Sequence, residues 1–175
     1  MTNILYSKTA PLNIYVANLA EYNNGNLVGS WISLPIEEND WKDFLKTIGN
    51  PAEYVTHDFD NNIGLDGLKI GKYESIDKLN NLTRRLSNLS PYEITVINAL
   101  YEVLEDLEQA LDYYESDNYV YYGDMTLEEI AQENIKEYYD IPEGLENYID
   151  YRLYASDMDI EGFYYKTTYG TIEML

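Results

Sequence analysis

The residues with the most regular spacing in this sequence are carboxylates that recur every three or four positions. Apolar spacing predicts one long helix from Pro91 to about Glu115, and residues three or four apart on a helix lie about 5–6 Å apart on one face. Charges on a nucleic-acid strand have a similar spacing. The acids that form this expected ridge are Glu102, Glu105, Glu108, Asp112 and Glu115.

A second set of acids follows the same rule. Glu129, Glu133 and Glu137 stand at i, i+4 spacing on a predicted helix, and Lys136 is the only base among them. Like charges at this spacing destabilise a helix by about 0.2–0.5 kcal/mol per pair. A solvated helix face also carries acids, but the scarcity of compensating lysines favours a role in binding a basic partner.

Two stretches resemble calcium-binding loops and fail on closer inspection. The window that begins at Asp58 has Ile63 where the loop needs glycine, and Lys69 where it needs the bidentate glutamate. The window that begins at Asp157 has Thr168 at that last position. We therefore expect no metal site.

Composition removes several enzyme classes. The sequence has no cysteine and one histidine, His57, which excludes disulfides, thiolate catalysis and multi-histidine metal sites. Glycine-rich nucleotide loops and the nucleophile elbow are absent as motifs. A glycosidase-like pair among the acids stays open but has no positive support. We interpret His57, beside Asp58, as a structural residue, and we expect no catalytic residue and no cofactor.

The charge is large and unevenly distributed. The 175 residues carry 32 acids and 11 bases, a net charge of -21. Residues 1–86 carry -3 and residues 87–175 carry -18, and twelve acids with no base lie between Arg85 and Lys136. Such a surface repels nucleic acid and attracts basic partners. A merely solubilising surface or salt adaptation is the competing interpretation, but salt adaptation would spread the charge over the whole chain.

The apolar content of 45% is sufficient for a folded core. No run of about 18 apolar residues and no signal-peptide pattern is present, so we expect a cytoplasmic protein that does not enter membranes. In the first half, residues 12–20 and 27–34 predict a hairpin around Gly25, residues 41–48 a short helix, and residues 54–57 a third strand. A cluster of Asn and Gly at residues 61–71 indicates a domain boundary.

The second half is predicted to be richer in helices. The apolar spacing from Ile76 to Leu89 predicts one helix, and Ser90 with Glu93 forms a capping box that opens the long helix. Thr126 with Glu129 forms another box, before a helix that ends near Pro142 with its apolar face turned inward. The inward residues of that helix are expected to be Leu127, Ile130, Ala131, Ile135 and Tyr138. Residues 119–122 have strand composition, residues 145–155 are expected to be helical, and residues 162–174 predict two short strands.

Tyrosine is concentrated in the same half as the acids. Fifteen of the twenty tyrosines follow Leu86. Tyrosine supplies buried area and a hydrogen-bonding hydroxyl without adding positive charge. We expect a symmetric dimer through this region, with Tyr119, Tyr121 and Tyr122 on an edge strand as its contacts.

Three segments together resemble the ArdA antirestriction family of conjugative, mobile genetic elements. The run from Ile14 to Ile32, with Tyr22, Gly25 and Trp31, resembles the opening hairpin of the family. The segment Glu53–Asp58 resembles the part after its first helix. The run from Ile141 to Asp157 resembles the region around its antirestriction motif. Residues 60–125 match in length and acidity only.

The resemblance implies an α+β fold in which three small domains form an elongated chain, and a homodimer through the C-terminal domains. The expected boundaries are 1–62 for an antiparallel sheet plus helix, 63–116 for a helical middle domain, and 117–175 for an acidic α+β domain. Family members imitate DNA, occupy the DNA-binding channel of type I restriction-modification enzymes, and do so without a cofactor. Here the partner would be the methyltransferase core, with cleavage, methylation or both blocked.

The acids expected to form the imitating surface are Glu102, Glu105, Glu108, Asp112, Glu115, Glu129, Glu133, Glu137, Asp150 and Asp157. The leading alternative is an acidic binding module for another basic DNA-binding protein. A hydrolase that uses two carboxylates is a third hypothesis, and it differs in predicting that one or two substitutions abolish activity.

Overall fold

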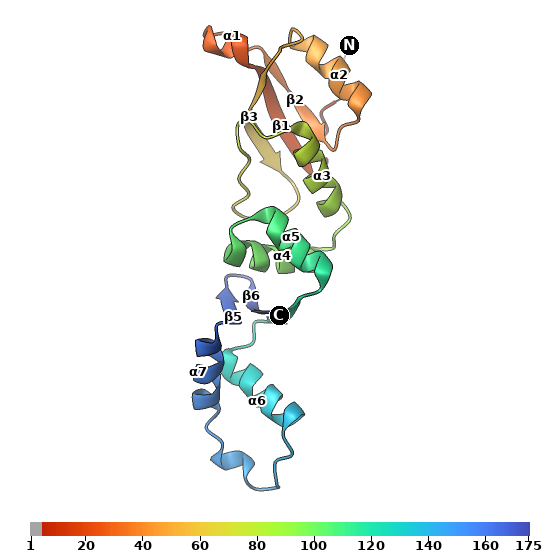
Figure 1. The fold of residues 1–175 in the computed structure, drawn as a ribbon. Helices are drawn as coiled ribbons and strands as arrows, with labels where there is room; N and C mark the ends of the chain where they lie inside the picture. The colour runs from red at the N-terminus through yellow and green to blue at the C-terminus, as the bar shows by residue number, and fades with distance from the viewer. Residues whose placement is uncertain (1–4) are drawn as a thin grey trace. The chain divides into compact units, whose positions relative to one another are not determined.

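The computed structural model describes residues 5–175 and has an α+β fold, as expected (Figure 1). The chain divides into two compact units, one ending at Ile94 and the other comprising Thr95–Leu175. Each unit holds one three-stranded antiparallel sheet. The division into three domains stays a prediction.

The first unit is built on strands β1 (Leu12–Asn18), β2 (Gly29–Leu34) and β3 (Tyr54–Asn61), in the order β2-β1-β3. β1 is the central strand and pairs Ile14 with Ile32 on one side and with Phe59 on the other. The predicted third strand is confirmed, and it extends four residues beyond His57.

The predicted hairpin is partly wrong, because β1 ends at Asn18 and a short helix, α1 (Leu19–Asn23), precedes the turn. Asn18 causes this change. Its Oδ1 accepts hydrogen bonds from the backbone N–H groups of Ala20 (3.1 Å) and Glu21 (3.3 Å), which caps the helix. Its Nδ2 donates to the carbonyl of Ile48 at 3.0 Å, so a buried side chain ties the helix start to a distant segment.

Helices α2 (Glu38–Thr47) and α3 (Ile76–Leu86) complete the core of the first unit. Phe44 of α2 and Leu79 of α3 pack with Ile14 in one buried cluster. Asn80 on α3 is buried, and its side chain both accepts from the backbone N–H of Ile36 (2.8 Å) and donates to its carbonyl (2.9 Å). Both helices lie where the apolar spacing predicts them.

Most of α4 (Pro91–Leu104) belongs to the second unit. Its predicted capping box is confirmed: the N–H of Ser90 donates to Glu93 Oε2 (2.7 Å), and the N–H of Glu93 donates to Ser90 Oγ (3.3 Å). The elements that follow are α5 (Leu107–Ser116), β4 (Tyr119–Gly123), α6 (Leu127–Tyr138), the 3-10 turn η1 (Glu146–Tyr148), α7 (Tyr151–Glu161), β5 (Tyr164–Thr167) and β6 (Gly170–Met174).

The second sheet has the order β4-β6-β5, so the three predicted strands are confirmed and β4 is an edge strand. One apolar cluster packs Ile172 of β6 against Leu100 of α4 and Ala110 of α5. Another joins α6 and α7 through Ile130, Ala131, Ala155 and Met158, and these two helices lie side by side (Figure 1).

Two expectations for this part of the chain are wrong. Tyr138 was placed on the inward face of α6, but its side chain is 71% exposed at the end of the helix. The helix expected from Leu145 to Ala155 is replaced by η1 and by α7, which begins at Tyr151. The carboxylate of Asp150 accepts from the N–H of Leu153 (3.1 Å) and caps α7, so this aspartate marks the true start of the helix.

Candidate functional site: an acidic surface on the second unit

The acids are concentrated in the second unit. Residues 95–175 contain 20 acids and 3 bases, whereas residues 1–94 contain 12 acids and 8 bases. Eighteen of those 20 acids are exposed, and the other two, Glu108 and Glu173, are partly buried. A net charge of -17 on one small unit creates a strongly negative field around it.

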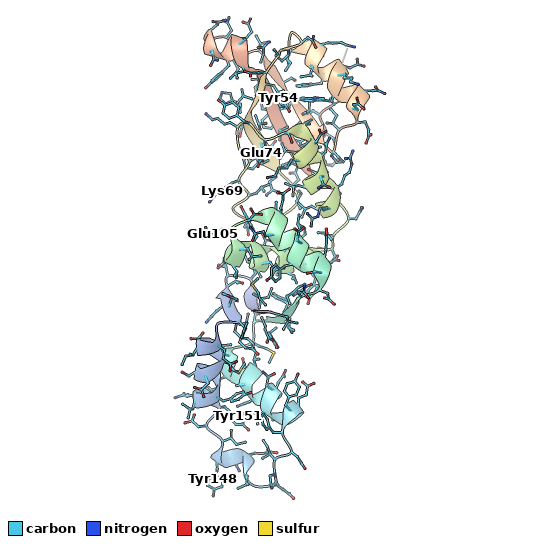
Figure 2. The ribbon with its side chains drawn as sticks, viewed as in Figure 1. Tyr54, Lys69, Glu74, Glu105, Tyr148 and Tyr151 are labelled. Atoms are coloured by element: carbon cyan, nitrogen blue, oxygen red, sulfur yellow. The ribbon has the colours of Figure 1, made fainter. Side chains whose placement is uncertain are left out.

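The prediction of one five-acid ridge on a single long helix is wrong, because two helices, α4 and α5, occupy this part of the chain. α4 ends at Leu104, and Glu105 takes a left-handed backbone with φ 55°. Asp106 then caps α5, since its carboxylate accepts from the N–H of Gln109 at 3.0 Å. Asp106 three residues before Gln109 is the local pattern that predicts a new helix start. Figure 2 shows Glu105 where the two helices meet.

The acids of the expected ridge therefore have different positions. Glu108, Asp112 and Glu115 remain together on one face of α5. Glu102 lies on α4, and its carboxylate accepts from the backbone N–H of Thr168 at 3.0 and 3.1 Å and from its Oγ1 at 3.3 Å. Glu102 thus holds the β5–β6 turn while its side chain remains at the surface.

On α6, one of the three predicted acids also has a local task. Glu129 completes the predicted capping box: its carboxylate accepts from the N–H (2.7 Å) and the Oγ1 (2.8 Å) of Thr126. These hydrogen bonds, the backbone one first, hold the pKa of Glu129 below its usual value. Glu133 and Glu137 are exposed one and two turns further on.

On α7, Asp157 is exposed as expected, whereas Asp150 caps the helix. Sequence reasoning missed Asp159 and Glu161, which are exposed on the same helix. The sequence does carry a signal for these two acids, because no base stands between Arg152 and Lys166. Counting every acid in this base-free segment would have included them in the predicted surface.

The three tyrosines proposed as dimer contacts lie on β4, and their rings pack within the unit. Tyr119 and Tyr121 pack against the cluster around Leu100. The hydroxyl of Tyr121 donates to the carbonyl of Tyr169. Tyr122 packs against the α6–α7 cluster instead. A role for these side chains in binding a second copy stays a prediction.

Tyr122 also belongs to a polar cluster with Tyr164 and Glu173, and the three residues lie on the three strands of the second sheet. Its hydroxyl donates to Glu173 Oε2 at 2.7 Å, and its ring lies 6.3 Å from that of Tyr164, which faces Glu173 across β5 and β6. Burial, with Glu173 next in importance, raises the pKa of Tyr122 and raises that of Tyr164 to about 12. Both tyrosines therefore stay neutral at physiological pH.

The remaining candidates for chemistry have structural settings. Asp58 and Asp60 lie on β3, and Asp157 and Asp159 lie on α7, so neither calcium-like window forms a loop. Within residues 5–175, no three His, Asp or Glu side chains gather as a metal site would require. The ring of His57 lies edge-on to that of Tyr22, with centroids 4.7 Å apart. No helix of the described chain is both long and apolar enough to cross a membrane.

These features describe an acidic α+β protein whose most distinctive property is a surface of carboxylates on regular elements. A family model for antirestriction proteins, ArdA, matches residues 14–173. The chain therefore belongs to the ArdA family, a family of inhibitor proteins rather than of enzymes. No curated protein matches the sequence significantly.

Proposed function

We propose that this protein is a DNA mimic that inhibits type I restriction-modification enzymes by occupying their DNA-binding channel. The observation that carries the proposal is the charge of the second unit. This unit contains 20 acids and only 3 bases, and nearly all of the acids are exposed. A channel that binds DNA is lined by Lys and Arg, so it attracts such an acidic surface. We place this interaction in the cytoplasm, where these enzymes act.

The structure separates two groups among the predicted acids. Glu102, Glu129 and Asp150 accept hydrogen bonds from their own chain. By contrast, Glu105, Glu133, Glu137 and Asp157 are exposed, and their side chains make no hydrogen bond or ion pair within the described residues 5–175. The second group is the better measure of binding, because its replacement leaves the caps and the β5–β6 turn intact.

Inhibition by a charged surface requires no cofactor and no reacting side chain. Each exposed charge pair with the enzyme contributes about 0.2–1 kcal/mol, because solvent screens it. Affinity therefore arises from many contacts, weakens as salt rises, and is lost when DNA already fills the channel. The methyltransferase core, which holds the DNA, is the proposed binding partner.

The first test removes charges at the second group. Single changes, Glu105→Gln, Glu133→Gln, Glu137→Gln or Asp157→Asn, should each weaken binding to the enzyme less than about tenfold. The four together should weaken binding cumulatively, by up to several hundredfold. Isothermal titration calorimetry or surface plasmon resonance with a purified methyltransferase core measures the dissociation constants.

The matched control removes the same charge from the first unit, with Asp40→Asn, Glu53→Gln, Asp60→Asn and Asp77→Asn. These acids are also exposed, so an equal loss of affinity would attribute binding to total charge and contradict a located surface. Loss of all inhibition through one conservative change would favour the hydrolase hypothesis instead.

Competition with duplex DNA tests the mimicry itself. The protein and a DNA duplex should exclude each other from the enzyme, and simultaneous binding would contradict the proposal. A basic protein of another kind that binds more tightly than the methyltransferase core would favour the alternative of a general acidic binding module. The proposal includes a homodimer, for which Tyr119, Tyr121 and Tyr122 are the contacts suggested by sequence.

A further inference from the structure

The first sheet has one face covered by helices and another face that carries aromatic rings. Ile14 and Ile32 belong to the buried cluster with α2 and α3. Because successive residues of a strand point to opposite faces, Tyr15 and Trp31 lie on the other face. These two residues stand opposite each other in the pairing of β1 with β2, and both side chains are partly exposed. The sheet thus presents aromatic surface on the side away from its own core.

Three rings on this face stand at steep angles to one another. The rings of Tyr15 and Trp31 meet edge to face at 75°, with centroids 5.7 Å apart. The ring of Tyr6, which is 36% exposed, is tilted by 55° to that of Trp31 at a centroid distance of 6.2 Å. A Cβ on Gly29 would lie 2.8 Å from Cε1 of Tyr15, so the ring of Tyr15 lies over this glycine. The rings form a corner rather than a flat stack, and Gly29 leaves room for one of its walls.

Two carboxylates share the face with these rings. On β3, Asp58 stands opposite Tyr15 and Asp60 stands opposite Asn13, and both aspartates are exposed. Oδ1 of Asp58 accepts from the backbone N–H of Phe59 at 2.9 Å. The side chain of Asp60 makes no hydrogen bond or ion pair within residues 5–175. The set that we call the aromatic face consists of Tyr6, Tyr15, Trp31, Asp58 and Asp60.

We propose that the aromatic face binds an arginine side chain on an exposed segment of a basic protein. A guanidinium group is planar and permanently charged, stacks on aromatic rings, and donates hydrogen bonds to carboxylates. The corner of rings offers the stacking surface, and Asp58 and Asp60 offer the acceptors. This surface lies in the first unit, so its role goes beyond the proposed function and involves neither the acidic surface of the second unit nor the homodimer.

The composition of the face argues against two other kinds of occupant. A helix that docks by hydrophobic burial needs large aliphatic side chains to pack on, and β1 and β2 present none on this side. Nucleic-acid bases also stack on aromatic rings, but two carboxylates on the face and 12 acids against 8 bases in residues 1–94 repel phosphates. The residues of β1 and β2 that face away from the core are Asn13, Tyr15, Ala17, Gly29, Trp31 and Ser33.

One base lies beside the aromatic face. Lys8 borders a depression of about 370 Å³ together with Tyr6 and Asp60. The depression offers space for the end of an arginine side chain next to a ring and a carboxylate. Asp60 favours a guanidinium there, whereas the like charge of Lys8 opposes it. Removing one or the other charge should therefore change arginine binding in opposite directions.

Trp31 provides a local readout, because the chain has only one other tryptophan. Trp41 stacks on Phe44 in the cluster on the covered face, so Trp41→Phe leaves Trp31 as the only indole of the full chain. A short peptide with two arginines should change the fluorescence of Trp31 in a saturable way. The indole N–H signal of Trp31 in the NMR spectrum of the unaltered chain gives the same readout if Trp41→Phe disturbs the fold.

The same peptide with lysines is the matched control, because it carries the same charge and the acidic second unit attracts both peptides alike. It should bind at Trp31 about two- to fivefold more weakly, since an ammonium group lacks the plane that stacks. Absence of a saturable change with the arginine peptide, or equal binding of the lysine peptide, would overturn the proposal. Tighter binding of a single-stranded oligonucleotide at Trp31 would also overturn it.

Substitutions on the aromatic face test the individual contacts with the arginine peptide. Asp60→Asn and Tyr6→Ser should each weaken binding about two- to fivefold, and Lys8→Gln should strengthen it by a similar factor. Asp40→Asn removes the same charge from α2, which covers the opposite face, and should leave binding unchanged. Equal weakening by Asp60→Asn and Asp40→Asn, weakening by Lys8→Gln, or no effect of either Asp60→Asn or Tyr6→Ser would overturn the proposal. These assays contain no restriction enzyme, so a failure of inhibition leaves their outcome unchanged.

Discussion

At the scale of single residues, a carboxylate in this protein has one of two roles that look identical in the sequence. Glu129 and Glu133 are one helical turn apart, and both are exposed acids. Glu129 accepts hydrogen bonds from Thr126 and closes the start of α6, whereas Glu133 contributes only to the negative field. Substitutions that test charge must therefore separate the two roles.

At this scale, we predict how the stability of the protein changes at low pH through Glu129. Hydrogen bonds lower the folded-state pKa of Glu129 below the usual 4.5. Its stabilising contribution is therefore present above the unfolded pKa and is lost as pH falls from about 4.5 through the lower folded value. Glu129→Gln should flatten the loss of stability in this range, measured by urea unfolding between pH 3 and 6, and Thr126→Ala should destabilise by about 0.5–2 kcal/mol at neutral pH.

Glu133→Gln is the matched control, because it removes the same charge without a cap. It should leave the stability unchanged or slightly higher at neutral pH, since it relieves repulsion along the helix. An acid profile that Glu133→Gln flattens as much as Glu129→Gln would contradict a capping role for Glu129.

At the scale of elements, the break between α4 and α5 decides how the acids are displayed. Glu105 adopts φ 55°, a conformation that favours glycine, and its N–H still donates to the carbonyl of Tyr101 at 2.9 Å. The next residue, Asp106, caps α5. Two short helices therefore replace one continuous charged ridge.

Glu105→Gly should stabilise the fold by up to about 1 kcal/mol, because glycine adopts the left-handed backbone without a steric cost. Glu105→Gln keeps the Cβ and removes only the charge, so it should change stability less. Chemical unfolding of both variants measures the difference. Destabilisation by glycine, relative to Gln, would show that the left-handed conformation is not the native one.

At the scale of the whole molecule, mutual repulsion among the acids opposes folding. The unit from Thr95 to Leu175 carries -17, and the ion pair between Arg152 and Glu128 involves exposed side chains, which solvent screens. Salt shortens the range of the repulsion, to about 10 Å at 0.1 M and 3 Å at 1 M. Salt should therefore affect folding and enzyme binding in opposite directions.

Raising NaCl from 20 to 500 mM should raise the melting temperature by about 2–4 °C, the shift that roughly 1 kcal/mol produces in a chain of this size. The variant with Glu105, Glu133, Glu137 and Asp157 neutralised should respond less. Calorimetry gives both values, and a melting temperature that is constant or falls with salt would contradict a repulsive surface.

Sequence patterns predicted the features that depend on neighbours within a few residues. The capping boxes at Ser90 and Thr126 are confirmed because a cap joins groups only three positions apart. The strand at residues 119–122 and the final strand pair were also visible in composition. The break at Glu105 was local too, but the apolar spacing that runs through it concealed the Asp106 cap.

The rest required the tertiary structure, because it depends on groups far apart in the chain. Glu102 meets Thr168 across 66 residues, and Tyr122 meets Glu173 across 51. Whether a tyrosine or a leucine is covered depends on which elements pack over it, so Tyr138 and Leu153 proved exposed while Tyr122 packs inward. The net charge depends only on the residue types, so the sequence alone determined it. Which charges remain available to a partner was decided by the fold, which uses some of them as hydrogen-bond acceptors.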